Sequence, residues 1–193
     1  MGNLNKDEEV KAAILASAKR VFQKWGLNKT TMEDIAREAG KGKSTLYYYY
    51  KSKDEILEVL ATSELRNIIH KAKSMISRET SAKEKLKKYI TATLIEIKNT
   101  SSIYPLVKGE IKGKKEFIDK LSNQINAIEE SIIMEILKEG HASGEFNFLR
   151  RDQLSKAANV IVGIIRGLEL YLFLDNDDSE KIDMVTRIIT EGI

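Results

Sequence analysis

The chain has 193 residues, of which 42% are hydrophobic and 32% charged, and it contains one proline and no cysteine. A chain of this length and composition folds around a core, and without cysteine it forms neither disulfides nor thiolate metal sites. Since no apolar run reaches the ~18 residues of a membrane span and the N-terminus lacks a signal-peptide core, we expect a cytoplasmic protein without membrane contact.

Positive charge is concentrated at the N-terminal end. Residues 1–53 contain 11 Lys and Arg against 6 Asp and Glu, a net charge of +5, whereas residues 54–193 contain 21 against 23, a net of −2. A basic end on a near-neutral body indicates a polyanionic partner for that end. Charge alone leaves open the alternative that this end is a solvated basic face.

The first predicted helix covers "EEVKAAILASAKRVFQKW", residues 8–25, and ends at Gly26. Its apolar residues recur at spacings of three and four, which is typical of an amphipathic helix. We expect all six of them in a core: Val10, Ile14, Ala18, Val21, Phe22 and Trp25.

Two short helices follow, residues 32–39 and 43–50, separated by Gly40-Lys41-Gly42. Thr30 or Thr31 can cap the first of them, and Gly40 stands where a tight turn needs a positive φ. Ser52 then caps a third, long helix. Two short helices joined by a glycine turn are typical of a helix-turn-helix.

The second short helix contains four consecutive tyrosines, Tyr47 to Tyr50, which no single helix face can bury. Leu46 is the predicted apolar anchor of this helix. Tyr50 lies four residues later on the same face, so we expect it in the core, with the other three tyrosines displayed beside Lys43 and Ser44. Displayed phenols can donate to phosphates or pack on base methyl groups. A protein-binding aromatic patch is the alternative, and the glycine turn and flanking lysines favour DNA.

The rest of the chain also reads as helical, so the predicted class is all-α. The further segments with helical character are residues 82–99, 114–140, 152–174 and 175–193, the last of which opens with acidic caps and closes as a helix. A short irregular stretch lies around Pro105 and a loop at 141–150.

Positions 10–60 resemble the DNA-binding domain of the TetR family of bacterial repressors. The resemblance rests on "F..WG" at residues 22–26, "TTMEDIAREAG" at 30–40, "STLYYYY" at 44–50 and "KSKDEIL" at 51–57. It covers about a quarter of the chain. It implies a three-helix DNA-binding domain at residues 1–53 and a larger helical domain for ligand binding and dimerisation at residues 54–193.

The same resemblance implies roles for individual residues. The expected base contacts are Lys43, Ser44 and Tyr47. The expected phosphate contacts are Thr31, Thr45, Tyr48, Tyr49 and Lys53. Two positions depart from the family pattern, Lys41 in the turn and Gly42 before the recognition helix, and they bear on which operator is read.

The segment from Leu154 to Leu174 is apolar on most faces, so we expect it to be buried on several sides. With the last helix it could form a four-helix interface in a homodimer, although a monomeric core helix is the alternative. The expected interface residues are Val160, Ile161, Ile164, Leu168, Ile182, Val185 and Ile189.

A ligand pocket for a small hydrophobic molecule is expected around aromatic residues of this domain. The candidates are Tyr89, Tyr104, Leu106, Phe117 and Tyr171, with Glu96, Glu110 or Glu169 as polar contacts. Acidic residues near aromatic rings would suit a cationic lipophile, whereas an acyl chain would need only apolar walls, and the sequence leaves both open.

The sequence bears on three function classes. The leading hypothesis is a ligand-responsive dimeric repressor of double-stranded operator DNA, and the second is a DNA-binding architectural or assembly protein without a ligand. An enzyme is not expected, because the chain shows no nucleophile–base set and no phosphate-binding glycine loop. No metal or cofactor is expected either, since the two histidines have no partner at metal-ligand spacing.

Overall fold

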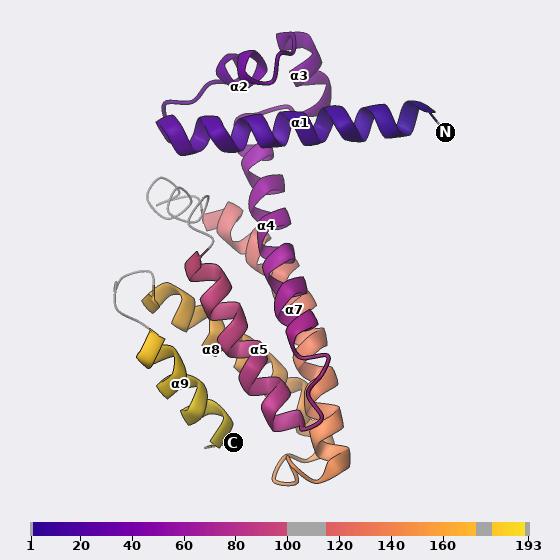
Figure 1. Ribbon diagram of the computed structural model, residues 1–193, viewed down its shortest axis with the longest axis vertical. Coiled ribbons are helices and arrows are strands. Elements are labelled where there is room, and N and C mark those ends of the chain that lie inside the picture. Colours follow the sequence, from indigo (N-terminus) through magenta and orange to yellow (C-terminus); the bar gives the residue numbers. More distant parts are fainter. Residues whose placement is uncertain (1, 100–114, 173–178, 192–193) are drawn as a thin grey trace. The chain divides into compact units, whose positions relative to one another are not determined.

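The computed structural model describes residues 2–99, 115–172 and 179–191, and within these ranges the chain is helical, without a strand (Figure 1). The all-α prediction is therefore confirmed. The helices are α1 (Gly2–Trp25), α2 (Met32–Glu38), α3 (Lys43–Tyr49), α4 (Lys53–Met75), α5 (Ala82–Asn99), α7 (Lys115–Ser143), α8 (Leu154–Leu172) and α9 (Ser179–Glu191), with a 3-10 turn at Arg151–Gln153. None of the described helices is long and apolar enough to cross a membrane.

The described chain separates into two compact units. The first contains α1 to α3, α4 up to Glu64 and the start of α7 up to Leu121. The second contains the remainder of α4 from Leu65, α5, the remainder of α7, α8 and α9. The division falls inside α4, eleven residues beyond the boundary at 53/54 that the sequence suggested.

The core of the first unit forms where α1 packs against α2 and α2 against α3. Ile14, Ala18, Val21 and Phe22 are buried in it, as their spacing predicts. Trp25 is not: its side chain is 41% exposed, with the Lys24 ammonium 5.2 Å from its ring centroid. The prediction for Trp25 was wrong because the chain reverses at Gly26, which has φ +80°, and Leu27 fills the core instead. Val10 is half-buried.

In the second unit α5 packs against both α8 and α9. Its buried face presents Leu86, Ile90 and Leu94 at helical spacing. At the C-terminal end of α7, Phe146 folds back onto Gly140, where a Cβ would lie only 2.2 Å from the Phe146 ring. Gly140 is therefore required by this close approach.

Candidate nucleic-acid interface

The turn between α2 and α3 depends on a glycine. Ala39 ends α2, and Gly40 follows with φ +60°, a conformation that glycine adopts without steric cost. The Lys41 amide donates to the Ala36 carbonyl at 2.9 Å and the Gly40 amide to the Arg37 carbonyl at 3.1 Å. These bonds satisfy the last carbonyls of α2 and set the direction of α3. The predicted positive φ at Gly40 is confirmed.

The start of α2 is fixed by reciprocal hydrogen bonds between Thr31 and Asp34. The Thr31 hydroxyl accepts from the Asp34 amide at 3.2 Å and donates to the Asp34 carboxylate at 2.6 Å, while the Thr31 amide donates to the same carboxylate at 3.0 Å. These bonds lower the pKa of Asp34. Thr31 is therefore the cap, and Thr30 instead donates to the Gly26 carbonyl at 2.6 Å. A phosphate contact by the Thr31 hydroxyl stays a prediction. To make it, the hydroxyl would have to donate its hydrogen bond to a phosphate oxygen in place of the Asp34 carboxylate.

Helix α3 divides its side chains between core and solvent. Leu46 is fully buried and Tyr50, four residues later, is 6% exposed, which confirms Tyr50 as the packed tyrosine. Tyr47 is 44% exposed and Tyr48 is 78% exposed. The remaining predicted contact residues of this helix, Lys43, Ser44, Thr45 and Tyr49, are exposed or half-buried. The outward face is therefore aromatic, hydroxylic and cationic.

Two of these outward groups are held by acids of the same unit. Lys43 forms an ion pair with Glu33, and its ammonium lies 5.8 Å from the Tyr47 ring centroid. The Tyr49 hydroxyl donates to the Asp7 carboxylate at 2.7 Å, and this bond raises the pKa of Tyr49 to about 12. Exposed pairs of this kind contribute little to stability, about 0–1 kcal/mol, so a phosphate can displace the acids. Sequence spacing gave no sign of Asp7, which lies 42 residues from Tyr49.

The Lys53 ammonium is hydrogen-bonded to backbone carbonyls. Its ammonium donates to the carbonyls of Leu27 at 2.7 Å, Thr30 at 2.9 Å and Asn28 at 3.3 Å. These three acceptors match the three donors of an ammonium group. In the free protein this side chain holds the loop between α1 and α2 onto the start of α4, and a phosphate contact by Lys53 stays a prediction.

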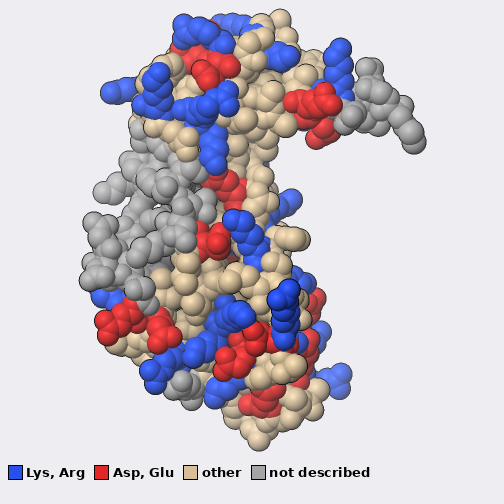
Figure 2. All heavy atoms as spheres, in the orientation of Figure 1, with Lys and Arg blue, Asp and Glu red and all other residues tan. Residues whose placement is uncertain are grey.

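The surface over α2 and α3 carries both signs of charge. Figure 2 shows Lys and Arg side chains over these helices, with acidic side chains between them. Glu38 of α2 pairs with Arg20 of α1 at 2.8 Å, and Glu33 pairs with Lys43. This surface is therefore not uniformly positive, and the predicted DNA binding would depend on individual side-chain contacts as well as on the net charge of residues 1–53.

In the second unit, the predicted pocket residue Tyr89 lies in a buried polar cluster. Its hydroxyl donates to Glu129 at 3.3 Å, and burial raises its pKa. Glu129 has no exposed surface and forms an ion pair with Arg166, whose Nε donates to Asn126 at 3.0 Å. A buried carboxylate needs such compensation. Sequence reasoning missed Glu129 and Arg166, because their partners lie on other helices.

The other pocket candidates are not tested by this structure. Tyr104, Leu106 and Glu110 lie outside the described residues, as do the side chains of Phe117, Glu169 and Tyr171. Glu96 forms an ion pair with Lys71 at 3.0 Å.

The predicted dimer residues fall into two groups. Ile161, Ile182 and Ile189 are buried within the chain, in helices that pack against α5, and their part in a dimer interface stays a prediction. Leu168 and Val185 are half-buried. In contrast, large apolar side chains are exposed on both helices, with Val160 59% and Ile188 65% exposed. They are Val160 and Ile164 of α8, and Met184 and Ile188 of α9.

Residues 14–60 match the model of the family described as bacterial regulatory proteins, tetR family. The chain is 31% identical over 163 residues to the HTH-type transcriptional regulator QacR of Staphylococcus aureus, covering 81% of this chain and 84% of that one. It is 27% identical over 135 residues to the HTH-type transcriptional repressor KstR2 of Mycolicibacterium smegmatis, covering 69% and 65%.

Among solved structures, the fold is similar to that of the transcriptional regulator FadR from Bacillus subtilis in complex with stearoyl-CoA. The TM-score is 0.73 at 24% identity, over 94% of this chain and 98% of that one. At this identity the likeness concerns the fold.

Proposed function

Because the chain belongs to the TetR family of helix-turn-helix transcriptional regulators, we propose that it is a homodimeric repressor that leaves its operator when a small hydrophobic effector binds. The observation that carries this proposal is the division of α3: Leu46 and Tyr50 anchor the helix, and the opposite face displays Lys43, Tyr47 and Tyr48. A helix held in this way can enter a major groove with its side chains already placed.

Within this proposal, Lys43, Ser44 and Tyr47 read base edges. The phosphate contacts are Thr31, Thr45, Tyr48, Tyr49 and Lys53. Base contacts carry sequence preference, whereas phosphate contacts position the protein and give a salt-dependent affinity. The domain division at 53/54 belongs to the same proposal, with α4 leading from the DNA-binding part into the effector and dimerisation part.

The dimer is supported by the exposed apolar side chains of α8 and α9. Large exposed apolar side chains spaced four residues apart on a helix, as in each of these two, are typical of a surface that a partner covers. Gly163 of α8 has no heavy atom within 4 Å of where its Cβ would lie, so that a partner helix can approach closely there. A two-fold dimer would place two α3 helices at half-sites about 34–36 Å apart.

Sedimentation velocity tests the dimer with Val160→Glu, which puts a charge among these side chains. The control is Val59→Glu, the same change at an exposed valine of α4. We expect Val160→Glu to sediment as a monomer and Val59→Glu as a dimer. A dimeric Val160→Glu would place the interface elsewhere.

Selection of bound DNA from a random pool tests the reading of DNA. A two-fold-symmetric motif supports the repressor, whereas binding without a motif that falls steeply with salt favours the architectural alternative. The relatives are transcriptional regulators, and we propose that this chain likewise has no catalytic activity, which a hydrolase screen checks.

A further inference from the structure

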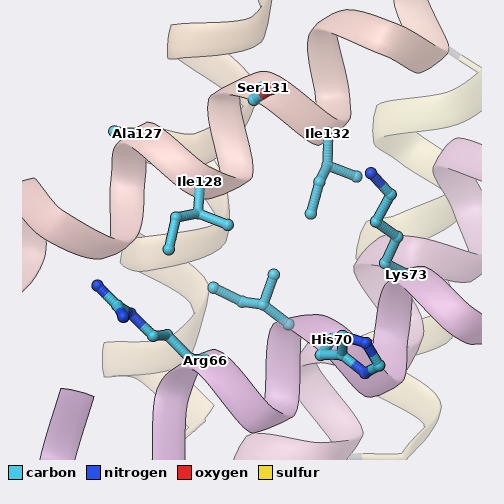
Figure 3. Close-up of a pocket in the computed structure, with 8 residues that line it drawn as sticks. Arg66, His70, Lys73, Ala127, Ile128, Ser131 and Ile132 are labelled. Atoms are coloured by element: carbon cyan, nitrogen blue, oxygen red, sulfur yellow. The ribbon is translucent and has the colours of Figure 1, made fainter. Parts of the chain in front are cut away.

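A groove of about 580 Å³ lies between α4 and α7, with every lining residue in the second unit (Figure 3). This volume is within the range of about 300–1,000 Å³ that is typical of small-molecule sites. The α4 wall presents Arg66, Ile69, His70 and Lys73, whose spacing of three and four places them on one helix face.

The opposite wall is largely apolar. It consists of Ala127, Ile128, Ser131 and Ile132 of α7. Ile132 is buried, as is Ile69 across the groove, and Ile128 is half-buried beside them. Figure 3 shows Ile128 and Ile132 along this wall, with Arg66 toward the Ile128 end and Lys73 toward the Ile132 end.

Positive charge in the groove is compensated at one end only. Lys73 is paired with Glu135 at 3.1 Å. Arg66 and His70 are exposed, and the side chain of neither forms an ion pair or hydrogen bond with any residue in the described part of the chain. The Arg66 end therefore carries a guanidinium without an acid, beside aliphatic side chains. A guanidinium suits a carboxylate because it offers two parallel donors.

We propose that this groove binds a fatty-acid carboxylate, with the head group at Arg66 and the aliphatic chain along Ile69, Ile128 and Ile132. The positive charge of Arg66 favours an anionic ligand over a cationic one, which would need acidic residues in the groove. The buried acid of this unit, Glu129, is no competing cation site, because Arg166 already compensates it. An effect of this binding on DNA rests on the proposed function, whereas the binding itself does not.

The test uses the full chain labelled at isoleucine methyl groups and titrated with decanoate below its micelle concentration, and in parallel with decyltrimethylammonium. We expect decanoate to shift the methyl signals of Ile69, Ile128 and Ile132, and the cation of equal chain length to leave them in place. Arg66→Glu should weaken decanoate binding at least about tenfold, because attraction becomes repulsion. Lys138→Glu, the same charge change at an exposed site of α7 outside the groove, should bind decanoate like the wild type.

Three outcomes would overturn the proposal: methyl shifts elsewhere only, equal shifts with the cation, or equal loss of binding in Arg66→Glu and Lys138→Glu. Operator affinity is measured separately by fluorescence anisotropy with and without decanoate. If decanoate binds the groove and operator affinity does not change, the groove assignment stands and its part in the proposed regulation fails.

Discussion

The hydroxyl of Tyr49 in α3 donates a 2.7 Å hydrogen bond to the carboxylate of Asp7 in α1. The proposed recognition helix is thus tied to the first helix by an acid at the surface that we assign to DNA. In the free protein Asp7 orients the phenol, and on DNA its negative charge opposes the phosphates.

Asp7→Ala should therefore strengthen DNA binding. The change frees the Tyr49 donor and removes one negative charge near the phosphates, so we expect tighter binding by a few-fold to operator and random DNA alike, most clearly at low salt. Anisotropy titrations at several salt concentrations measure this. Tyr49→Phe should weaken both kinds of binding, and weaker binding of Asp7→Ala would show that orienting the phenol matters more than repulsion.

Neighbouring tyrosines should differ in their effect on stability. Tyr50→Ala removes a buried ring and should lower the free energy of unfolding by about 3–5 kcal/mol. Tyr48→Ala removes a ring that is 78% exposed and should change it by less than about 0.5 kcal/mol. Urea unfolding followed by circular dichroism measures both, and equal losses would contradict the assignment of faces.

Gly140→Ala should destabilise the second unit, although alanine favours a helix over glycine by about 1 kcal/mol. The added Cβ would lie 2.2 Å from the Phe146 ring and 2.9 Å from the Ala82 Cβ. Thermal unfolding should show a lower Tm. A double-mutant cycle with Phe146→Leu provides the control, since the smaller side chain should reduce the cost of Gly140→Ala.

Glu145 should make stability depend on pH. Its carboxylate accepts hydrogen bonds from the Ser81 hydroxyl at 2.6 Å, the Ala82 and Lys83 amides at 3.0 Å, and the Ser143 hydroxyl at 2.9 Å. These bonds lower its pKa to about 2.

Because the folded-state pKa lies below the ordinary value, the contribution of Glu145 is fully present above about pH 4.5 and is lost as pH falls toward 2. Glu145→Gln should therefore unfold at a lower urea concentration than the wild type at pH 7, with a smaller gap at pH 3. If the difference in urea midpoint between the wild type and Glu145→Gln does not change with pH, the effect comes from hydrogen bonding alone and not from the charge of Glu145.

Sequence reasoning succeeded where structure depends on nearby residues. The Gly40 turn, the Thr31 cap and the packing of Tyr50 over Leu46 involve partners within a few positions, so propensity and periodicity predict them. The same holds for the apolar stripe of α1 as far as Phe22.

Sequence reasoning failed where a partner lies far along the chain. Lys53 is engaged by carbonyls of residues 27–30, and Tyr49 by Asp7, and no local pattern signals either bond. In the same way, periodicity gives the apolar residues of α8 and α9 without showing which of them α5 covers. In the structure Ile161 is buried, whereas its neighbour Val160 is exposed.

The central claim is that the outward face of α3 reads DNA. The most direct measurement is the anisotropy-based ratio of affinities for the selected operator and for random DNA, in the wild type and in the triple variant Lys43→Ala, Ser44→Ala, Tyr47→Phe. Each lost base contact should cost about 1–3 kcal/mol of discrimination, so the triple variant should lose most of its operator preference. The control variant Lys138→Ala, which changes an exposed lysine of α7, should keep the operator preference of the wild type. A triple variant that folds and still prefers the operator as strongly as the wild type would contradict the account.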